Sequence, residues 1–224
     1  MGVTPWSLLD STKVPGTGEP LRLLQRGEDF SLRLGNIELM NSRAYNSEVQ
    51  LATLSLAKIA GRKKPRLLIA GLGMGFTLRA ALDGLPKDAR IDVVELVPAV
   101  VTWNRGPLGP VSKNALDDPR VNLIQGDVAM TIYGATGAYD VIALDVDEGP
   151  EGSAAATVRL YDNEGVRAAY RALRPGGVFA VWSPGPDQRF APRLRKAGFA
   201  VEELRVTAGA NGGSKHVIWL GQRP

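Results

Sequence analysis

The sequence predicts an α/β protein with a seven-stranded, mostly parallel sheet and a small antiparallel β element at its N-terminus. From residue 66 onward, short apolar runs alternate with helical segments, which is the pattern of βαβ units. Most of these runs are apolar throughout, as expected for strands covered on both faces. The expected arrangement is Rossmann-like. We divide the chain into a β-hairpin element with a linking helix (residues 1–60) and a Rossmann-like domain (residues 61–224).

The N-terminal region has the pattern of short strands joined by tight turns. Residues 1–20 are rich in proline and glycine, so we expect an irregular lead-in there. Apolar runs at 21–24, 30–34 and 37–40 follow, separated by Gly27 and by the pair Gly35 and Asn36, which is a two-residue hairpin signal. Residues 20–41 are therefore expected to be antiparallel strands. A helix with apolar residues at helical spacing should follow, ending near Gly61.

The second region contains the strands and helices of the main sheet. The predicted strands are 67–70, 91–95, 121–125, 139–145, 178–183, 199–206 and 216–220. The predicted helices are a segment ending near 82, one beginning near 98, a long helix over 157–173 and one over 188–197. A glycine-rich loop alone joins the last two strands, so they should pair antiparallel. This is the arrangement of class I methyltransferase-like folds.

Composition excludes several kinds of chemistry and partner. With no cysteine and one histidine, a cysteine nucleophile, a disulfide, a thiolate site or a histidine-rich metal site is excluded, and we expect no metal. The net charge is only +4, and the basic run at 62–66 contains no aromatic residues for base stacking, so we expect no nucleic-acid partner. The sequence has neither a long apolar span nor a secretory signal, so we expect a cytoplasmic protein without a membrane segment.

Candidate functional residues follow the first four strands of the main sheet. Open α/β sheets bind ligands at the carboxyl ends of their strands, so these positions should lie together. The candidates are Gly71, Gly73, Met74 and Gly75 after the first strand, Glu95 after the second, Asp127 after the third, and Asp145 and Asp147 after the fourth. Their order along the chain favours a site for a nucleoside-containing cofactor.

Each residue type in this set has a chemical reason. Glycines let the backbone approach a ligand closely. Glu95 suits hydrogen bonds to the two hydroxyls of a ribose, and Asp127 is placed to accept a hydrogen bond from the amino group of an adenine. Taken singly, Glu95 is also consistent with a solvent-facing acid and Asp127 with a turn former. An NAD(P)-binding oxidoreductase domain is an alternative, but Gly75 comes one residue early for that fingerprint and Phe76 stands where it needs a small residue.

Residues 21–206 resemble the spermidine synthase (polyamine aminopropyltransferase) family. The resemblance rests on the N-terminal hairpin, the helix start at Glu48, and the segments LLIAGLGMGFTLRAAL, VVELVPAVV, DDPRVNLIQGD, YDVIALDVDEGP and LYDNEGVRAAYRALRPGGVFAVW. It implies a Rossmann-like transferase with a small N-terminal β-domain, assembled as dimers or tetramers, and we expect a homodimer. It also implies that Glu95 binds ribose, Asp127 binds adenine, and Asp145 helps to deprotonate an attacking amine.

The chain departs from the family pattern on both the donor side and the acceptor side of the pocket. Met74 stands where the family has an aspartate that holds the propylamine of decarboxylated S-adenosylmethionine. That aspartate would repel the carboxylate of ordinary S-adenosylmethionine, and Met74 removes both effects. The second acid of the family's gate loop, Asp147, comes one residue early, and Asn46, Ser47 and Glu48 replace the family's Tyr-His-Glu or Tyr-Gln-Glu. The polyamine side of the pocket is therefore not reproduced.

The resulting hypothesis is an enzyme that transfers a methyl or aminopropyl group to a small amine or another nucleophilic metabolite. The donor is S-adenosylmethionine or its decarboxylated form, with a slight preference for methyl transfer. Asp145 and Asp147 are the expected catalytic residues. His216 lies away from the strand-end cluster and is not expected to act as a base, and Trp182 is expected to be a core residue. The alternatives are a non-catalytic nucleoside-binding or assembly module on the same scaffold and the NAD(P)-binding domain.

Overall fold

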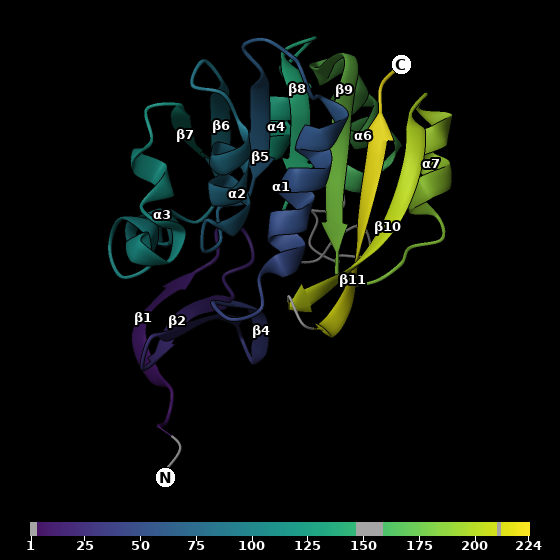
Figure 1. The fold of residues 1–224 in the computed structure, drawn as a ribbon. Coiled ribbons are helices and arrows are strands. Elements are labelled where there is room, and N and C mark those ends of the chain that lie inside the picture. The colour runs from purple at the N-terminus through teal and green to yellow at the C-terminus, as the bar shows by residue number, and fades with distance from the viewer. Residues whose placement is uncertain (1–3, 147–158, 210–211) are drawn as a thin grey trace.

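The computed structural model describes residues 4–146, 159–209 and 212–224. It contains a seven-stranded sheet with helices on both faces, and a four-stranded antiparallel sheet beneath the carboxyl ends of the parallel strands (Figure 1). This confirms the predicted fold class. The order in the large sheet is β10-β11-β9-β8-β5-β6-β7, in which β11 pairs antiparallel with both neighbours and the other pairs are parallel.

The strands have these bounds: β1 Ser7–Lys13, β2 Pro20–Arg26, β3 Asp29–Leu34, β4 Ile37–Asn41, β5 Arg66–Ala70, β6 Arg90–Glu95, β7 Val121–Gln125, β8 Tyr139–Leu144, β9 Leu173–Ser183, β10 Ala200–Gly209 and β11 Gly212–Gln222. The helices are α1 Asn46–Lys58, α2 Phe76–Gly84, α3 Pro98–Arg105, α4 Val128–Tyr133, α6 Asn163–Ala172 and α7 Phe190–Lys196, with 3-10 turns η1 Gly109–Ser112 and η2 Ala115–Asp117.

The large sheet separates two hydrophobic cores. Neighbouring residues of a strand point to opposite faces, so Ile69 packs with α1, α2, α3 and the small sheet, while Leu68 packs with α4, α6 and α7. Both side chains are almost completely buried. Burial on both faces explains why the central strands lack the alternating pattern of a half-exposed strand.

The N-terminal lead-in is more regular than the sequence predicts. The expectation of an irregular segment over residues 1–20 is wrong, because Ser7–Lys13 form β1 and pair antiparallel with β2. The prolines and glycines lie largely outside this strand, in the turn that leads to β2. The side chains of β1 are largely exposed, which is why hydrophobic patterning did not reveal it.

The predicted long helix over 157–173 is also wrong in its bounds. Helix α6 begins at Asn163, because Asp162 has extended backbone and its carboxylate accepts the N–H groups of Glu164 and Gly165, both at 2.8 Å. Residues 157 and 158 lie outside the described part of the chain. At the other end, β9 begins at Leu173, and its register with β8 shifts across the Pro-Gly-Gly segment that we expected only to end the helix.

Two contacts attach the small sheet and α1 to the large sheet. The indole Nε1 of Trp103 in α3 donates to Asp10 Oδ2 in β1 at 2.7 Å, and this hydrogen bond lowers the pKa of Asp10. The side-chain amide of Asn46 donates to the carbonyl of Thr207 in β10 at 2.9 Å. Helix α1 packs on β9, β10 and β11, so it covers the large sheet rather than the small one.

Buried acids anchor the end of the sheet opposite the small β element. Asp140 in β8 pairs with Arg62 at 2.7 Å and Arg174 at 2.9 Å. Asp92 in β6 accepts from Arg66 and from the hydroxyl of Tyr139, at 2.9 and 3.0 Å. Burial, followed by the charge of Asp92, raises the pKa of Tyr139 to about 12. In the described ranges, no helix is long and apolar enough to cross a bilayer.

Candidate active site

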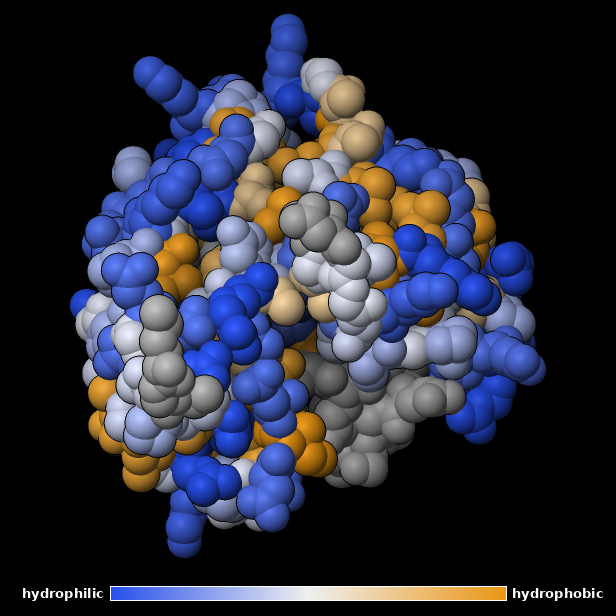
Figure 2. All heavy atoms as spheres, turned by 60° about the horizontal axis from the view of Figure 1, so that its bottom comes forward, coloured by the Kyte–Doolittle hydropathy of each residue, from blue (hydrophilic) through white to orange (hydrophobic). Residues whose placement is uncertain are grey.

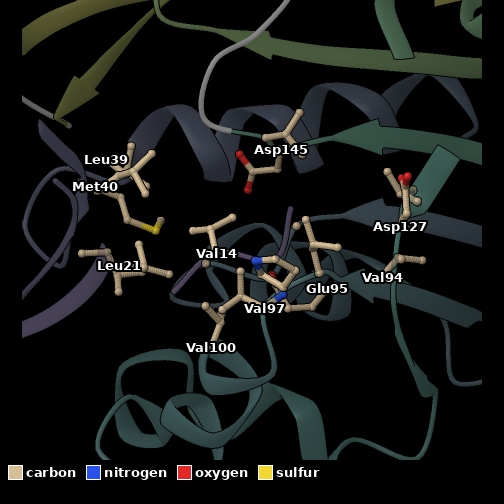
Figure 3. Close-up of a pocket in the computed structure, with 18 of the residues that line it drawn as sticks. Val14, Leu21, Leu39, Met40, Val94, Glu95, Val97, Val100, Asp127 and Asp145 are labelled. Carbon is tan, nitrogen blue, oxygen red and sulfur yellow. The ribbon is translucent and has the colours of Figure 1, made fainter. Parts of the chain in front are cut away.

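A cavity of about 250 Å³ lies at the carboxyl ends of β5, β6, β7 and β8, and the small sheet contributes the facing wall (Figure 3). Figure 2 views the molecule from this side and shows hydrophobic residues as separate patches among hydrophilic ones. Five of the predicted site residues line the cavity: Gly71, Gly73, Glu95, Asp127 and Asp145. Met74 and Gly75 lie behind them, and Asp147 is outside the described residues.

The glycine turn after β5 requires glycine for close backbone packing. Gly71 has φ +85°, and a Cβ there would lie 2.4 Å from the carbonyl oxygen of Asp145. Gly73 has φ +51°, and its Cβ position is occupied by the thioether of Met40 from the small sheet. The Asn104 amide donates to the Gly73 carbonyl at 2.8 Å. Helix α3 therefore holds the turn from one side while β8 meets it from another.

Met74 and Gly75 do not line the cavity. The Met74 side chain is fully buried in the core on the α1–α3 face. Gly75 precedes α2 with φ +81°, and a Cβ there would lie 2.8 Å from the Cβ of Ser112. Both residues shape the turn, and the turn presents no carboxylate to the cavity.

Glu95 is the most constrained acid at the site. It is 7% exposed, and its two oxygens accept the backbone N–H groups of Leu72 and Val97, each at 2.8 Å. Burial raises the pKa of Glu95, while backbone N–H groups, first those of Val97 and Leu72, oppose that effect. An ionised carboxylate has about four acceptor positions, so each oxygen keeps capacity for one more donor. This is the geometry needed to receive two neighbouring hydroxyls.

Asp127 combines the two roles considered for it from the sequence. Its Oδ1 accepts the Ala129 N–H at 2.8 Å and caps α4. The residue also lines the cavity, at the opposite end from Met40 (Figure 3). A cap bond uses one oxygen, so the carboxylate keeps acceptor capacity toward the cavity.

Asp145 lies between the two ends of the cavity. Its backbone N–H donates to Ala70 at 2.9 Å, which continues the pairing of β8 with β5 beyond the strand end. Its Oδ2 accepts the hydroxyl of Thr77 in α2 at 2.6 Å, and the same hydroxyl lies 3.2 Å from the Glu48 carbonyl. The carboxylate is therefore oriented by a neighbour from the first turn of α2.

The first turn of α1 brings a second carboxyl group to the cavity. Glu48 lines the cavity and is 6% exposed, and burial raises its pKa. Its Oε2 accepts the Ser47 hydroxyl at 2.5 Å, and Ser47 Oγ lies 3.0 Å from Nδ1 of His216. His216 does not line the cavity itself, but Ser47 links it to Glu48, which does. Trp182, expected to be a packing residue, is largely buried and also lines the cavity.

Aliphatic side chains form the wall opposite the acids. They come mainly from the small sheet and its turns: Val14, Leu21, Leu32, Leu34, Leu39 and Met40. Figure 3 shows several of them facing the side of the cavity where Asp145 lies. The sequence offered no signal for this role, because the same residues are what the core of a small antiparallel sheet requires. No cluster of three or more potential metal ligands occurs within residues 4–146, 159–209 and 212–224.

Comparison with known proteins shows the family to which this chain belongs. The sequence profile of the "Spermine/spermidine synthase domain" matches residues 50–186. A polyamine aminopropyltransferase of Mycobacterium tuberculosis is 30% identical over 192 residues, which are 81% of this chain and 35% of that protein. Putrescine N-methyltransferase 1 of Nicotiana tabacum is 35% identical over 145 residues, which are 64% of this chain and 36% of that protein. The chain thus matches about a third of the length of these relatives.

Solved structures agree on the fold. Spermidine synthase from Thermotoga maritima matches with a TM-score of 0.78 and 19% identity, over 97% of this chain and 73% of that one. A spermidine synthase in complex with the transition-state analogue AdoDATO matches with a TM-score of 0.77 and 18% identity, over 97% and 72%. The profile match spans more than half of the sequence, and the chain therefore belongs to the spermine/spermidine synthase domain family.

Proposed function

We propose that this protein transfers the methyl group of S-adenosylmethionine to a small amine, with aminopropyl transfer from the decarboxylated donor as the second candidate. The observation that carries the proposal is the convergence of Glu95, Asp127 and Asp145 on one cavity beside a glycine turn. Relatives named for both reactions support the wider class of transferase.

The cavity suits a nucleoside donor. Glu95 has both oxygens oriented by backbone N–H groups and would receive the ribose hydroxyls. Asp127 would receive the adenine amino group, and the Gly71–Gly73 turn would let the donor lie against the backbone. When bound, S-adenosylmethionine supplies a methyl group activated by a positively charged sulfur.

The residues near Asp145 would prepare the acceptor. Carboxylates attract a cationic amine, and a carboxylate near the attacking nitrogen can take its proton. Asp145 and Glu48 both line the cavity and are linked through Thr77, which keeps Asp145 oriented. The aliphatic side chains of the facing wall would help to exclude water from the acceptor, which strengthens the charge interactions inside. Glu19, which precedes β2, adds a further carboxyl group to the lining. Asp147 remains a further predicted catalytic acid.

Two features favour methyl over aminopropyl transfer. The glycine turn contributes no acidic side chain to the cavity, and Met74, which stands where aminopropyltransferases carry an aspartate, is turned into the core. The donor carboxylate of S-adenosylmethionine would therefore meet no repelling charge from this turn. The charged propylamine of the decarboxylated donor would also lack a partner there.

Calorimetric titration with both donors tests the proposal. We expect S-adenosylmethionine to bind more tightly than its decarboxylated form, and a ligand at 100 times its Kd to stabilise the fold by about 2.7 kcal/mol. Tighter binding of the decarboxylated donor would reverse the order of the two candidates. Binding of NAD(P) in place of both donors would overturn the transferase proposal.

Turnover with a panel of small amines, including putrescine, tests catalysis. We expect wild-type protein to methylate at least one amine and Asp145→Asn to lose about 10²-fold or more of that rate, because the carboxylate that orients the ammonium group for proton transfer is lost. Donor affinity should stay unchanged in this variant, because Glu95 and Asp127 hold the donor. Donor binding without turnover of any amine would favour the non-catalytic alternative. Light scattering would test the predicted homodimer.

A further inference from the structure

Two adjacent side chains of α1 and one side chain of β11 form a hydrogen-bonded chain that begins at the cavity. Glu48 lines the cavity, its Oε2 lies 2.5 Å from Ser47 Oγ, and Ser47 Oγ lies 3.0 Å from His216 Nδ1. Ser47 is fully buried and Glu48 nearly so, whereas His216 is only partly buried. The chain therefore runs from a buried carboxyl group at the site to an imidazole that reaches toward solvent.

Aromatic contacts hold both ends of this chain in place. Tyr45, just before α1, stacks on Phe76 at the start of α2 with ring centroids 4.1 Å apart. This contact fixes the first turn of α1, which carries Ser47 and Glu48. The rings of His216 and Trp182 pack in a T-shaped arrangement, with their centroids 4.8 Å apart and their planes at 75°. One contact supports the backbone beside Ser47 and Glu48, and the other positions the His216 ring.

The charged groups around the chain are few. Arg205 and Lys215 are the nearest charged residues on β10 and β11, and both lie one position out of register with His216, so they point to the other face of the sheet. On the face that His216 shares with α1, the carboxyl groups packed near the chain are Glu48 itself and, through Thr77, Asp145. Among residues 4–146, 159–209 and 212–224, no lysine or arginine lines the cavity.

We propose that Glu48, Ser47 and His216 form a proton relay that carries the proton of the acceptor amine from the cavity toward solvent. This inference rests on the proposed function, since it needs a protonated amine at the site. Glu48 would be a catalytic residue, in contact with the amine, and Ser47 and His216 would act through it.

The proton balance is closed without any further reactant. The ionised Glu48 carboxylate takes a proton from the ammonium nitrogen of the acceptor, which frees the lone pair that forms the new N–C bond. While Glu48 is ionised, the Ser47 hydroxyl donates to Oε2; once Glu48 is protonated, the hydroxyl turns toward Nδ1 of a neutral His216. As the proton passes from Glu48 to Ser47 Oγ, the hydroxyl proton of Ser47 moves to Nδ1, and the imidazolium loses its Nε2 proton to water. Exchange of the ring proton from Nδ1 to Nε2 through water, with return of the Ser47 hydroxyl to Glu48, restores the starting state with Glu48 ionised.

The electrostatic environment favours these protonation states. Burial raises the pKa of Glu48, which makes its carboxylate a stronger base than an exposed one. Burial lowers the pKa of His216, so the imidazole is neutral near pH 7 and can accept a proton. A general base is most effective when its pKa lies near the working pH.

NMR of the single histidine tests the coupling without any need for activity. We expect the His216 pKa to fall in Glu48→Gln, because the neutral amide no longer stabilises the imidazolium, and to change in Ser47→Ala, which removes the link. Ser55→Ala is the matched control: Ser55 is buried in the same helix but donates to the Leu51 carbonyl at 2.6 Å. A His216 titration that is identical in all four proteins would overturn the relay.

Single-turnover kinetics test the relay in the reaction, using the amine of the panel that wild type methylates fastest. Ser47→Ala and His216→Asn should each lower the single-turnover rate about tenfold or more at pH 7. The loss should become smaller as the pH rises toward the pKa of the free amine, because more of the amine is then already deprotonated. Asparagine can keep a hydrogen bond at the Nδ1 position but cannot carry the proton. Donor Kd should stay within twofold of wild type, and Ser55→Ala should react at the wild-type rate.

The outcomes separate the relay from the function on which it rests. Absence of transfer by wild type refutes the proposed function. Transfer by wild type with unchanged rates and unchanged pH profiles in Ser47→Ala and His216→Asn refutes the relay alone. A loss that is independent of pH, or that appears in donor Kd, would assign these residues a purely structural role and would also refute the relay.

Discussion

Glu95 illustrates how one residue can serve both the fold and the site. Its carboxylate accepts N–H groups from the glycine turn and from the start of α3, so it holds two loops together. The same bonds orient its remaining acceptor positions toward the cavity. Since a charged hydrogen bond contributes more than a neutral one, replacement of this carboxylate should affect the ligand more than the fold.

We predict that Glu95→Gln weakens binding of S-adenosylmethionine by about 1.5–3 kcal/mol, or about 10- to 100-fold in Kd. The amide retains the size of the side chain but loses the charge and one acceptor. Calorimetry measures this loss, with Asp83→Asn as the control, because Asp83 pairs with Arg79 on the exposed face of α2. Equal donor affinity in Glu95→Gln and wild type would remove Glu95 from the donor site.

The raised pKa of Glu95 also predicts a pH dependence of binding. A carboxyl whose pKa lies above its usual range becomes protonated at a higher pH than an exposed glutamate, and the protonated form accepts fewer hydrogen bonds. Donor affinity should therefore fall as pH drops through that pKa. In Glu95→Gln this dependence should disappear, which calorimetry at pH 7.5 and 5.5 can compare directly.

At the scale of elements, the site depends on turns and helix starts. The glycine turn fits against β8 only because Gly71 has no side chain, and α6 begins where it does because Asp162 caps it. In both cases a single residue decides the course of the backbone. The consequences of changing them differ, since one lies at the cavity and the other away from it.

Gly71→Ala should destabilise the protein by more than the about 1–2 kcal/mol that a left-handed conformation costs an L residue. The added Cβ would also press on the Asp145 carbonyl at 2.4 Å and displace Asp145. The free energy of unfolding measured in urea and the rate of amine turnover should therefore both fall. Gly185→Ala is the control, because its Cβ would meet nothing within 4 Å and its φ is not positive. Similar behaviour of the two variants would contradict the packing argument.

Asp162→Ala should lower the free energy of unfolding by about 1 kcal/mol, the usual effect of removing an N-cap. The change removes the acceptor for two N–H groups at the start of α6. Asp162→Ser keeps a capping oxygen and should recover most of the loss in urea unfolding. Equal destabilisation by both substitutions would mean that the cap bonds are not the cause.

At the scale of the whole molecule, the two ends of the large sheet have different tasks. The carboxyl ends of the strands and the small sheet enclose the cavity. At the opposite end, the buried Asp140 and Asp92 form ion pairs with arginines. The basic segment before β5 belongs to this second group, because Arg62 and Arg66 pair with those buried acids. Stability and ligand binding should therefore respond to different substitutions.

Asp140→Ala should destabilise the protein by about 3 kcal/mol, because it leaves two guanidinium groups and the Arg66 N–H without their shared carboxylate. Because both arginines are partly exposed and can be hydrated, we expect the loss of stability to be at the lower end of the range for a broken buried ion pair. Urea unfolding measures the loss. Donor Kd should change less than twofold in the folded variant; a large change would show that the two ends are coupled.

The sequence by itself determined the sheet and the positions of the strand-end acids. Apolar runs and the turn residues between them are local signals, and parallel strands necessarily bring their carboxyl ends to one edge. Glu95, Asp127 and Asp145 could therefore be predicted to meet. The strand β1 and the start of α6 were missed because one lacks buried side chains and the other depends on a single capping carboxylate.

Only the tertiary structure decided which residues complete the cavity. Met40 meets the glycine turn, Met74 turns away into the core, and His216 reaches Ser47 across 169 positions of sequence. Each of these outcomes depends on how α1 and the small sheet pack against the large sheet. Packing between separate elements is set by shape and burial over the whole molecule, and no periodicity within a single segment records it.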